Sequence, residues 1–343
     1  MINSVESDGM SANLLIGLYG ASGFTGALVA QELKARGFVV RLGARRQEAS
    51  ALADRLGFDL SVFSLSDTRE LGNFLDGVSL VVNCAGPFAE TAPVLARAAV
   101  ECGVHYLDVT GEPPVVSNLC DEFAEFAAHA GRYIVPAVGF FGALPDFMAS
   151  ALVEWLSQVE SVSIAYFLSK WHMTKGSGLA AATLRGRQYQ YVNGKSTSTI
   201  GPPRLARHDY PPPVGDIPVI TCYPAPEAIL LPRHLPIRNL DVRMSASTFA
   251  GETAALANAQ ADPSDIDFMV MVRAESRDTS LSAVAVGHDI YGITAPIVGE
   301  VVSRFVSQEP KGGGVVTPAE LFPATDFLES IRDNFFGLEI PHR

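Results

Sequence analysis

Hydrophobic and polar positions follow first a strand-like and then a helix-like pattern near the start of the sequence. Residues 14–19 form an uncharged apolar run, a glycine-rich turn follows, and residues 27–37 are apolar on one side and charged on the other. The apolar run is typical of a strand buried on both faces of a sheet. The stretch after the turn predicts an amphipathic helix with Gly37 as its C-terminal cap.

The same alternation continues to residue 138 and predicts five further strands with helices between them. Strands that alternate with helices indicate a parallel, doubly wound α/β sheet of the Rossmann type. Because its crossovers are right-handed, the loops after the first and fourth strands lie together at the carboxyl edge. The further strands are expected at 38–43, 61–65, 78–84, 105–109 and 133–138, and the helices at 47–56, from Ser66-Asp67 onward, at 91–102 and at 115–129.

The second half has a different pattern, in which predicted strands pair with near neighbours in sequence. Strands are expected at 161–168, 268–274 and 281–286, and Asn193-Gly194 favours a two-residue hairpin turn. These features predict an α+β domain built on a mixed or antiparallel sheet. Helices are expected at 145–156, 179–188, 252–259 and 294–306, whereas dense prolines predict a long irregular segment over 201–236 that covers a cleft.

The glycine turn after the first strand carries the clearest chemistry. Gly20, Gly23 and Gly26 stand between a buried strand and a helix, where glycines permit a tight turn, close approach of a pyrophosphate and close packing of helix on strand. The helix N-terminus then offers free N–H groups to the phosphates. We therefore predict a dinucleotide site; the alternative is a plain strand-to-helix turn that binds nothing.

Two arginines at the end of the second strand favour NADP over NAD. An NAD-specific domain usually has an acid here for the ribose 2′-hydroxyl, whereas this chain has Arg45 and Arg46. Guanidinium groups bind a 2′-phosphate well; the alternative is that they are solvated charges at a helix start. The predicted cofactor-binding residues are Gly20, Ser22, Gly23, Phe24, Thr25, Gly26, Arg45, Arg46, Ser66, Asp67, Cys84, Ala85, Gly86, Pro87, Thr110, Gly111 and Glu112.

Composition and charge exclude several classes of partner. The 343 residues carry a net charge of −12, which argues against nucleic acid and anionic membrane surfaces. The longest apolar stretches are broken by glycines or by Pro145-Asp146, so we expect no integral membrane segment. Four cysteines show no metal-ligand spacing, so we expect no metal site and a cytoplasmic location.

The domain organisation follows from these patterns. Residues 1–12 lack a basic region ahead of an apolar core and are expected to be a flexible tail rather than a signal peptide. We expect an NADP-binding Rossmann domain at 13–146 and a substrate and dimerisation domain at 147–286. The C-terminal segment, 287–343, is expected to return to the nucleotide domain.

Four ordered motifs in the first half resemble the saccharopine dehydrogenase-like NADP-binding oxidoreductases. They are GASGFTG, the ARR after the second strand, NCAGPF and YLDVTGE. The group includes saccharopine reductases and trans-acting enoyl reductases. Members commonly have a GFD…PSD pattern, of which PAVGFFGALPD keeps Gly139, Phe140, Pro145 and Asp146 but has Phe141 in place of the first acid. The closing VGHDIYGITA and GGGVVTPAELF are similar to the enoyl-reductase-like branch.

The resemblance implies an NADP(H)-dependent oxidoreductase that reduces a C=C, C=N or C=O bond of a small or lipid-like substrate. Candidate proton donors are Lys170 and His172, which follow a predicted strand, and the phenol of Tyr291. For His172 the alternative is a structural or surface role. Asp108 is expected to tie loops together, with Thr110 and Glu112 nearer the nicotinamide. The competing hypothesis is a non-catalytic NADP-binding sensor or partner subunit.

The second domain is predicted to join two copies of the chain. Its apolar sheet has few predicted helices to cover it, and an uncovered sheet is normally paired or covered. Two-fold pairing of one patch is the commonest arrangement in oligomers. We therefore expect a homodimer joined through the second domain; the alternative is a monomer in which 201–236 covers the sheet.

Overall fold

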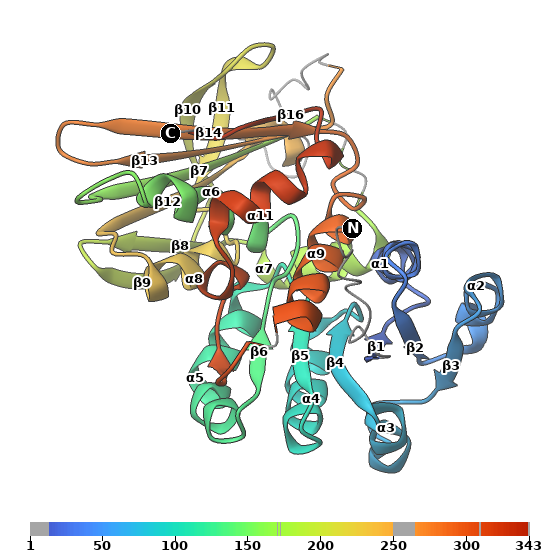
Figure 1. The fold of residues 1–343 in the computed structure, drawn as a ribbon. Coiled ribbons are helices and arrows are strands. Elements are labelled where there is room, and N and C mark those ends of the chain that lie inside the picture. Colours follow the sequence, from blue (N-terminus) through green and yellow to red (C-terminus); the bar gives the residue numbers. More distant parts are fainter. Residues whose placement is uncertain (1–13, 170, 172, 250–264, 309, 342–343) are drawn as a thin grey trace, which may run out of the picture.

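The computed structural model describes residues 14–169, 171, 173–249, 265–308 and 310–341. The expected tail at 1–12, the expected helix at 252–259, Lys170 and His172 lie outside the described residues. The chain forms two sheets, one above the other in Figure 1, with helices between them and below the lower sheet.

The first sheet has seven parallel strands in the order β15-β6-β5-β4-β1-β2-β3. Strand β1 lies between β2 and β4, so the loops after the first and fourth strands are neighbours, as predicted. The strands are β1 (Leu15–Tyr19), β2 (Val39–Ala44), β3 (Asp59–Val62), β4 (Val78–Asn83), β5 (His105–Asp108), β6 (Tyr133–Val135) and β15 (Gly314–Val315). The helices are α1 (Phe24–Ala35), η1 (Gln47–Ala49), α2 (Ser50–Leu56), α3 (Thr68–Leu75), α4 (Phe88–Glu101) and α5 (Pro113–His129).

Two strands of this sheet differ from the predicted bounds by more than one residue at an end. The strand expected at 61–65 lies at Asp59–Val62, because pairing with β2 sets its register and Phe63 instead packs its ring against Tyr19 and Phe74. The strand expected at 133–138 ends at Val135. There the chain bends away, since the φ angle of Ala137 is +57° and its N–H is bound by the Asp108 carboxylate.

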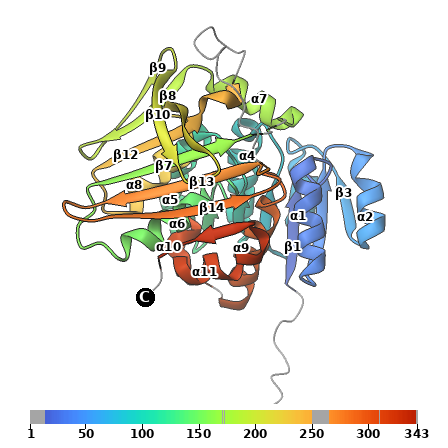
Figure 2. The same cartoon turned by 90° about the horizontal axis from the view of Figure 1, so that it is seen from above.

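The second sheet has nine strands and is mixed. Its main order is β10-β11-β12-β7-β13-β14-β16, with β8 paired to β12 and β9 paired to β8. Strands β12 and β7 are parallel, and the other pairs are antiparallel. Figure 2 shows these strands side by side, with α1 and α2 of the first sheet beyond one end. The strands are β7 (Ser161–Leu168), β8 (Arg187–Val192), β9 (Lys195–Ile200), β10 (Arg204–Tyr210), β11 (Gly215–Thr221), β12 (Asn239–Ser245), β13 (Phe268–Glu275), β14 (Ser280–Gly287) and β16 (Gly337–Glu339).

The proline-rich stretch 201–236 is ordered structure, contrary to the prediction of an irregular segment. It forms the hairpin β10–β11 and then α8 (Glu227–His234). The prolines lie mainly before β10, in the hairpin turn at 211–213 and before α8, so the stretches between them are free to pair. The helix expected to reach Gln188 is α7 (Lys175–Leu184), because Arg187 already begins β8.

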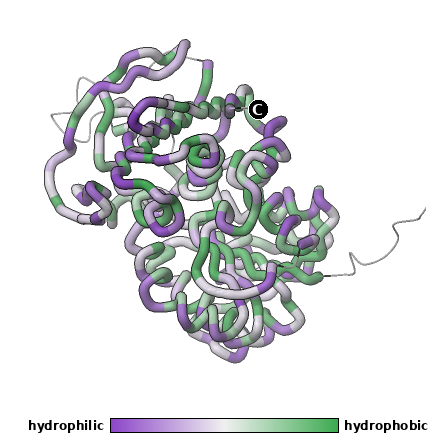
Figure 3. Tube along the Cα trace, turned by 60° about the vertical axis from the view of Figure 1, so that its left-hand side comes forward, coloured by the Kyte–Doolittle hydropathy of each residue, from purple (hydrophilic) through white to green (hydrophobic). Residues whose placement is uncertain are grey.

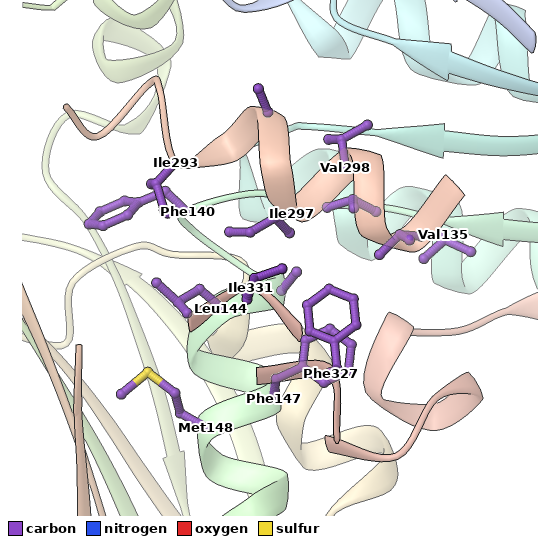
Figure 4. Close-up of a cluster of buried hydrophobic side chains, with 14 of the residues drawn as sticks. Val135, Phe140, Leu144, Phe147, Met148, Ile293, Ile297, Val298, Phe327 and Ile331 are labelled. Atoms are coloured by element: carbon purple, nitrogen blue, oxygen red, sulfur yellow. The ribbon is translucent and has the colours of Figure 1, made fainter. Parts of the chain in front are cut away.

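A shared core joins the two sheets. Helix α6 (Ala143–Val153) passes between them, and ten of its eleven residues are buried. Figure 4 shows Phe147 and Leu144 of α6 facing side chains of the C-terminal helices, and the rings of Phe147 and Phe327 stack with their centroids 3.8 Å apart. The remaining helices are η2 (Ala246–Phe249), α9 (Thr294–Gln308), α10 (Pro318–Leu321), α11 (Ala324–Ser330) and η3 (Arg332–Asn334).

The C-terminal segment contacts both sheets. Helix α9 packs on α1, β15 adds a strand to the first sheet, and β16 adds a strand to the second. Because α6 and this segment pack against both sheets, we propose the domain boundaries at residues 146 and 286 from the sequence alone.

The tube in Figure 3 shows hydrophobic stretches gathered inside and hydrophilic stretches on outer loops. No described helix has the length and apolar character needed to span a bilayer.

Candidate cofactor and substrate site

A cavity of about 540 Å³ lies at the carboxyl ends of β1, β2, β4 and β5. One part of its wall comes from the first sheet, and the other from α7 and the loops before α6, α8 and α9. The crevice at the carboxyl ends of such a sheet is where doubly wound folds bind ligands.

The glycine turn forms the floor of the cavity where β1 meets α1. A Cβ atom on Gly20 would lie 2.6 Å from the backbone nitrogen of Ala85, and one on Gly26 would lie 2.2 Å from the Gly20 carbonyl oxygen. Both glycines are therefore required by close backbone packing. Gly23 is the N-cap of α1 and supplies no capping side chain, so the first N–H groups of this helix stay available to an anion.

A buried hydrogen-bond network shapes the loops after β4 and β5. The Asn83 side chain accepts a hydrogen bond from the Ala85 N–H (3.0 Å) and donates to the Tyr106 hydroxyl (3.0 Å). Tyr106 donates in turn to the Asp108 carboxylate (2.9 Å), which also accepts from the N–H groups of Thr110 and Ala137. Burial raises the pKa of Asp108 to about 6, against the lowering effect of these bonds. Asp108 thus ties the loops together, as predicted.

Glu112 links the two loops at the edge of the cavity. Its carboxylate accepts a hydrogen bond from the Phe88 N–H at the start of α4 (3.1 Å), and its own N–H donates to the Thr110 hydroxyl (3.1 Å). Glu112 lines the cavity, whereas Thr110 is fully buried behind it. Burial raises the pKa of the Glu112 carboxyl.

The part of the wall that belongs to the second sheet is aromatic and apolar. Phe141 is at its centre, with ring centroids 6.2 Å from Trp171 and 6.5 Å from Tyr223. Behind it lies Tyr166 of β7, at 4.9 Å. Other described lining residues of this part are Phe140, Ala180, Ala181, Leu184, Pro224, Ala225 and Ile290.

Tyr291 stands where the glycine turn and α7 meet. Its hydroxyl accepts hydrogen bonds from the Trp171 indole N–H and the Thr174 N–H (both 3.0 Å) and donates to the Ser177 hydroxyl (2.9 Å). Its ring meets Phe24, the first residue of α1, edge to face at 5.5 Å. The phenol that the sequence marks as a candidate proton donor is therefore already engaged in a local network.

Residues 16–135 match the family of saccharopine dehydrogenase NADP binding domains. Over these residues the chain is therefore similar to a saccharopine dehydrogenase-type NADP-binding domain. The match runs from β1 to β6 and includes the glycine turn and Arg45.

Curated relatives resemble the chain over a similar length. A lipid droplet localized protein of Caenorhabditis elegans is 29% identical over 137 residues, 36% of this chain and 32% of that protein. A trans-acting enoyl reductase of Mycobacterium ulcerans is 32% identical over 131 residues, 36% of this chain and 31% of that protein. A saccharopine dehydrogenase-like oxidoreductase of Rattus norvegicus is 26% identical over 143 residues, 36% of this chain and 33% of that protein. The chain thus matches about a third of the length of these relatives.

The fold of the chain is similar to that of a solved structure over most of its length. Apo saccharopine dehydrogenase (L-Glu forming) from Saccharomyces cerevisiae superimposes with a TM-score of 0.65, covering 95% of this chain and 99% of that chain at 14% identity. At this identity the likeness shows a shared fold, and it confirms the predicted α/β architecture.

The NADP-binding domain fits its cofactor at three described features. The glycine turn has no room for side chains at Gly20 and Gly26, and the uncapped start of α1 suits a pyrophosphate. Arg45 lines the cavity just after the end of β2. Arg46 points elsewhere: its side chain is 80% exposed and lies 3.8 Å from Glu48. The cavity therefore has one of the two predicted arginines in its wall.

The other predicted contacts divide into two groups. Those that line the cavity are Gly20, Ser22, Gly23, Phe24, Thr25, Cys84, Ala85, Gly86, Gly111 and Glu112. Gly26 packs on Gly20, Pro87 is the N-cap of α4, and Thr110 is buried. Asp67 caps α3 by accepting a hydrogen bond from the Glu70 N–H, and Ser66 bonds the Ser64 hydroxyl. These five residues pack or bond within the loops and helix starts around the site, and they do not line the described part of the cavity.

Sequence reasoning missed a buried carboxylate beside the aromatic wall. Glu227 of α8 is fully buried and accepts hydrogen bonds from the Gly142 N–H (2.6 Å) and the Tyr166 hydroxyl. Burial raises its pKa to about 6. Nearby, Asp146 and His234 share a 2.7 Å hydrogen bond. Glu227 lies in the proline-rich stretch with no local motif, so nothing in the sequence pointed to it.

Proposed function

We propose that the chain is an NADP-dependent oxidoreductase that transfers a hydride to a C=C, C=N or C=O bond of a small or lipid-like substrate. The proposal rests on one observation: a continuous cavity joins the glycine turn to the aromatic wall of the second sheet. A dinucleotide on the turn leaves the aromatic part of the cavity for a second, largely apolar molecule.

The chain's own residues have three tasks in such a reaction. When bound, NADPH supplies the hydride, so the protein binds, orients and excludes water. The turn and Arg45 hold the dinucleotide end, and the network of Asn83 and Asp108 keeps the loops after β4 and β5 in place. Phe141 and Trp171 exclude water from the substrate end.

An enoyl-reductase-like substrate is favoured within this class. The described part of the aromatic wall contains Phe140, Phe141, Trp171, Tyr223 and Ile290, which suit an apolar acyl group better than a dicarboxylate. The likeness to a trans-acting enoyl reductase and to a lipid droplet localized protein agrees with this choice.

The proton donor is proposed to be Lys170 or His172, because the hydroxyl of Tyr291, the third candidate from the sequence, is already engaged. Lys170 and His172 flank Trp171 in sequence, and Trp171 lines the cavity. The competing proposal is a non-catalytic NADP-binding sensor or partner subunit, and it is favoured by the engagement of the Tyr291 hydroxyl with three neighbours.

Turnover measurements separate the two proposals. NADPH oxidation is followed with a panel of enoyl thioesters, enones, imines and carbonyl compounds, and the transferred hydride is tracked with NADPH deuterated on one face. Stereospecific transfer to any member supports the oxidoreductase. Tight NADPH binding, measured by calorimetry, without turnover on the whole panel contradicts it and supports the sensor.

We further propose a cytoplasmic homodimer joined through the second sheet. The support is the exposure of large apolar side chains on β9 and β10, where Ile200 is 78% and Leu205 48% exposed. Light scattering at micromolar concentration is expected to give twice the chain mass of 36.5 kDa. A mass of one chain contradicts the dimer.

A further inference from the structure

Tyr291 connects three segments that are far apart in the sequence. It comes shortly before α9, and its ring contacts Phe24 at the start of α1. Its hydroxyl contacts Trp171, Thr174 and Ser177 before and within the first turn of α7. Phe24, Trp171, Thr174, Ser177 and Tyr291 all line the cavity. The contacts of Tyr291 therefore hold one side of the site to the other.

The hydroxyl of Tyr291 uses its full hydrogen-bonding capacity in this network. A phenol has one O–H donor and two acceptor lone pairs. Here the proton is donated to Ser177, while the oxygen accepts from the indole N–H of Trp171 and the backbone N–H of Thr174. A group arranged in this way orders its neighbours and has no proton directed at a substrate.

The network also fixes the start of α7. Thr174 is the N-cap of this helix, and its hydroxyl accepts a hydrogen bond from the Ser177 N–H (3.1 Å). Tyr291 contacts both the N-cap residue Thr174 and Ser177 of the first turn, and so orders the start of α7. Ala180, Ala181 and Leu184 on the same helix form part of the apolar wall. A shift of the helix start would therefore move the substrate end of the cavity.

We propose that Tyr291 is a positioning residue, which holds α7 and Trp171 over the substrate end of the cavity. It acts through these neighbours rather than as the proton donor. The inference rests on the proposed function for its kinetic consequence only, because the position of Trp171 can be measured without substrate.

The first test uses tryptophan fluorescence. The chain has two tryptophans, so Trp155→Phe leaves Trp171 as the reporter. In that background Tyr291→Phe keeps the ring against Phe24 but removes the acceptor of the Trp171 N–H. We expect a shifted Trp171 emission and quenching by acrylamide that rises about twofold. Tyr189→Phe is the matched control, since no described group bonds its hydroxyl and it is absent from the described wall.

The second test separates positioning from proton donation. For Tyr291→Phe we expect KM of the substrate found in the panel to rise about tenfold, because the three hydrogen bonds of the hydroxyl are lost, with kcat changed less. The Kd for NADPH, measured by calorimetry, is expected to stay within about twofold, because the cofactor contacts lie at the glycine turn. The pH dependence of kcat is expected to keep the same shape as in the unmodified chain, including its fall at alkaline pH.

A double-mutant cycle tests whether the groups act together. Ser177→Ala removes the acceptor of the Tyr291 proton and is expected to change Trp171 quenching in the same direction as Tyr291→Phe. The double variant is expected to show less than the sum of the two effects. Additive effects contradict a shared network.

Two other results overturn the inference. If Tyr291→Phe leaves Trp171 emission and quenching unchanged, Tyr291 does not position α7. If it abolishes kcat and removes the alkaline limb of the pH profile, Tyr291 is the proton donor. Failure of the proposed function is distinguishable, since it appears as absent turnover in the unmodified chain while the fluorescence test still gives an answer.

Discussion

The guanidinium of Arg36, the C-cap residue of α1, lies 2.8 Å from the Glu300 carboxylate of α9 and so holds the last part of the chain against the first helix. Arg36 also bonds Glu32 (2.7 Å) and the Ser303 hydroxyl (3.1 Å). A Cβ atom on Gly299 would come within 2.6 Å of the Arg36 side chain. A side chain at this position of α9 would therefore have to displace the side chains of Arg36 and Glu32.

Replacing Arg36 should loosen this helix pair. We expect Arg36→Ala to lower the free energy of unfolding by about 2 kcal/mol, because charge-assisted hydrogen bonds to a half-buried partner are lost. Urea unfolding measures the change. The exposed Arg207–Asp216 pair on β10 and β11 is the control, and Arg207→Ala is expected to cost less than about 1 kcal/mol. Equal losses would mean that the contact with α9 adds nothing.

The glycine turn between β1 and α1 gives a second prediction. A methyl group at residue 26 would lie 2.2 Å from the Gly20 carbonyl oxygen, so Gly26→Ala is expected to displace the turn and weaken NADPH binding at least about tenfold. Gly72→Ala is the matched control, because Gly72 is inside helix α3 and a Cβ atom there meets nothing within 4 Å. The control should keep its affinity and gain up to about 1 kcal/mol of stability. Calorimetry and thermal unfolding measure both.

Cofactor choice is expected to depend on the two arginines unequally. Arg45→Ala should weaken NADPH binding by about 1.5–3 kcal/mol and leave NADH little changed, since a charged hydrogen bond to phosphate is lost. Arg46→Ala should have a smaller effect, because Arg46 is exposed and outside the cavity wall. Titration of both variants with both cofactors measures this. Equal loss of NADPH and NADH affinity in Arg45→Ala would contradict the 2′-phosphate assignment.

Glu227 is expected to make stability depend on pH. Burial raises its pKa to about 6, above the 4.5 of an exposed glutamate, so between these values the folded state binds more protons than the unfolded state. Its contribution therefore favours the folded state at low pH and is lost as the pH rises through 6.

Glu227→Gln removes this titration. We expect the free energy of unfolding of the variant, relative to that of the unmodified chain, to rise by about 2 kcal/mol as the pH goes from 4.5 to 7.5. Urea unfolding at several pH values measures the difference in free energy of unfolding between the two proteins. The titration of His105, whose pKa burial lowers to about 4, is common to both and cancels in this difference. A difference that does not change with pH would show that Glu227 titrates normally.

Lys170 and His172 give a prediction about the proton donor. If one of them protonates the product, its replacement (Lys170→Met or His172→Asn) should lower kcat about a hundredfold while the Kd for NADPH stays the same. Single-turnover kinetics with deuterated NADPH measure the chemical step. If neither change lowers kcat, the proton comes from elsewhere.

The sequence predicted well those secondary-structure elements that depend on a short, continuous stretch of residues. The strand, glycine turn and helix at 15–35 follow from an apolar run, small residues and an amphipathic period, all within two dozen positions. Strand β7 has the predicted bounds. The hairpin turn at Asn193-Gly194 has positive φ angles at both residues (51° and 75°), as that dipeptide favours.

Only the tertiary structure decided which distant stretches meet. Strands β15 and β16 have two and three residues, too few for any periodic pattern, and exist because β6 and β14 offer free edges. The pairing partner also determined the register of β3. Glu227 meets the Gly142 N–H across 85 residues of chain, and Arg36 meets Glu300 across 264. Such contacts depend on the burial of whole elements against one another, and no local run of residues records that burial.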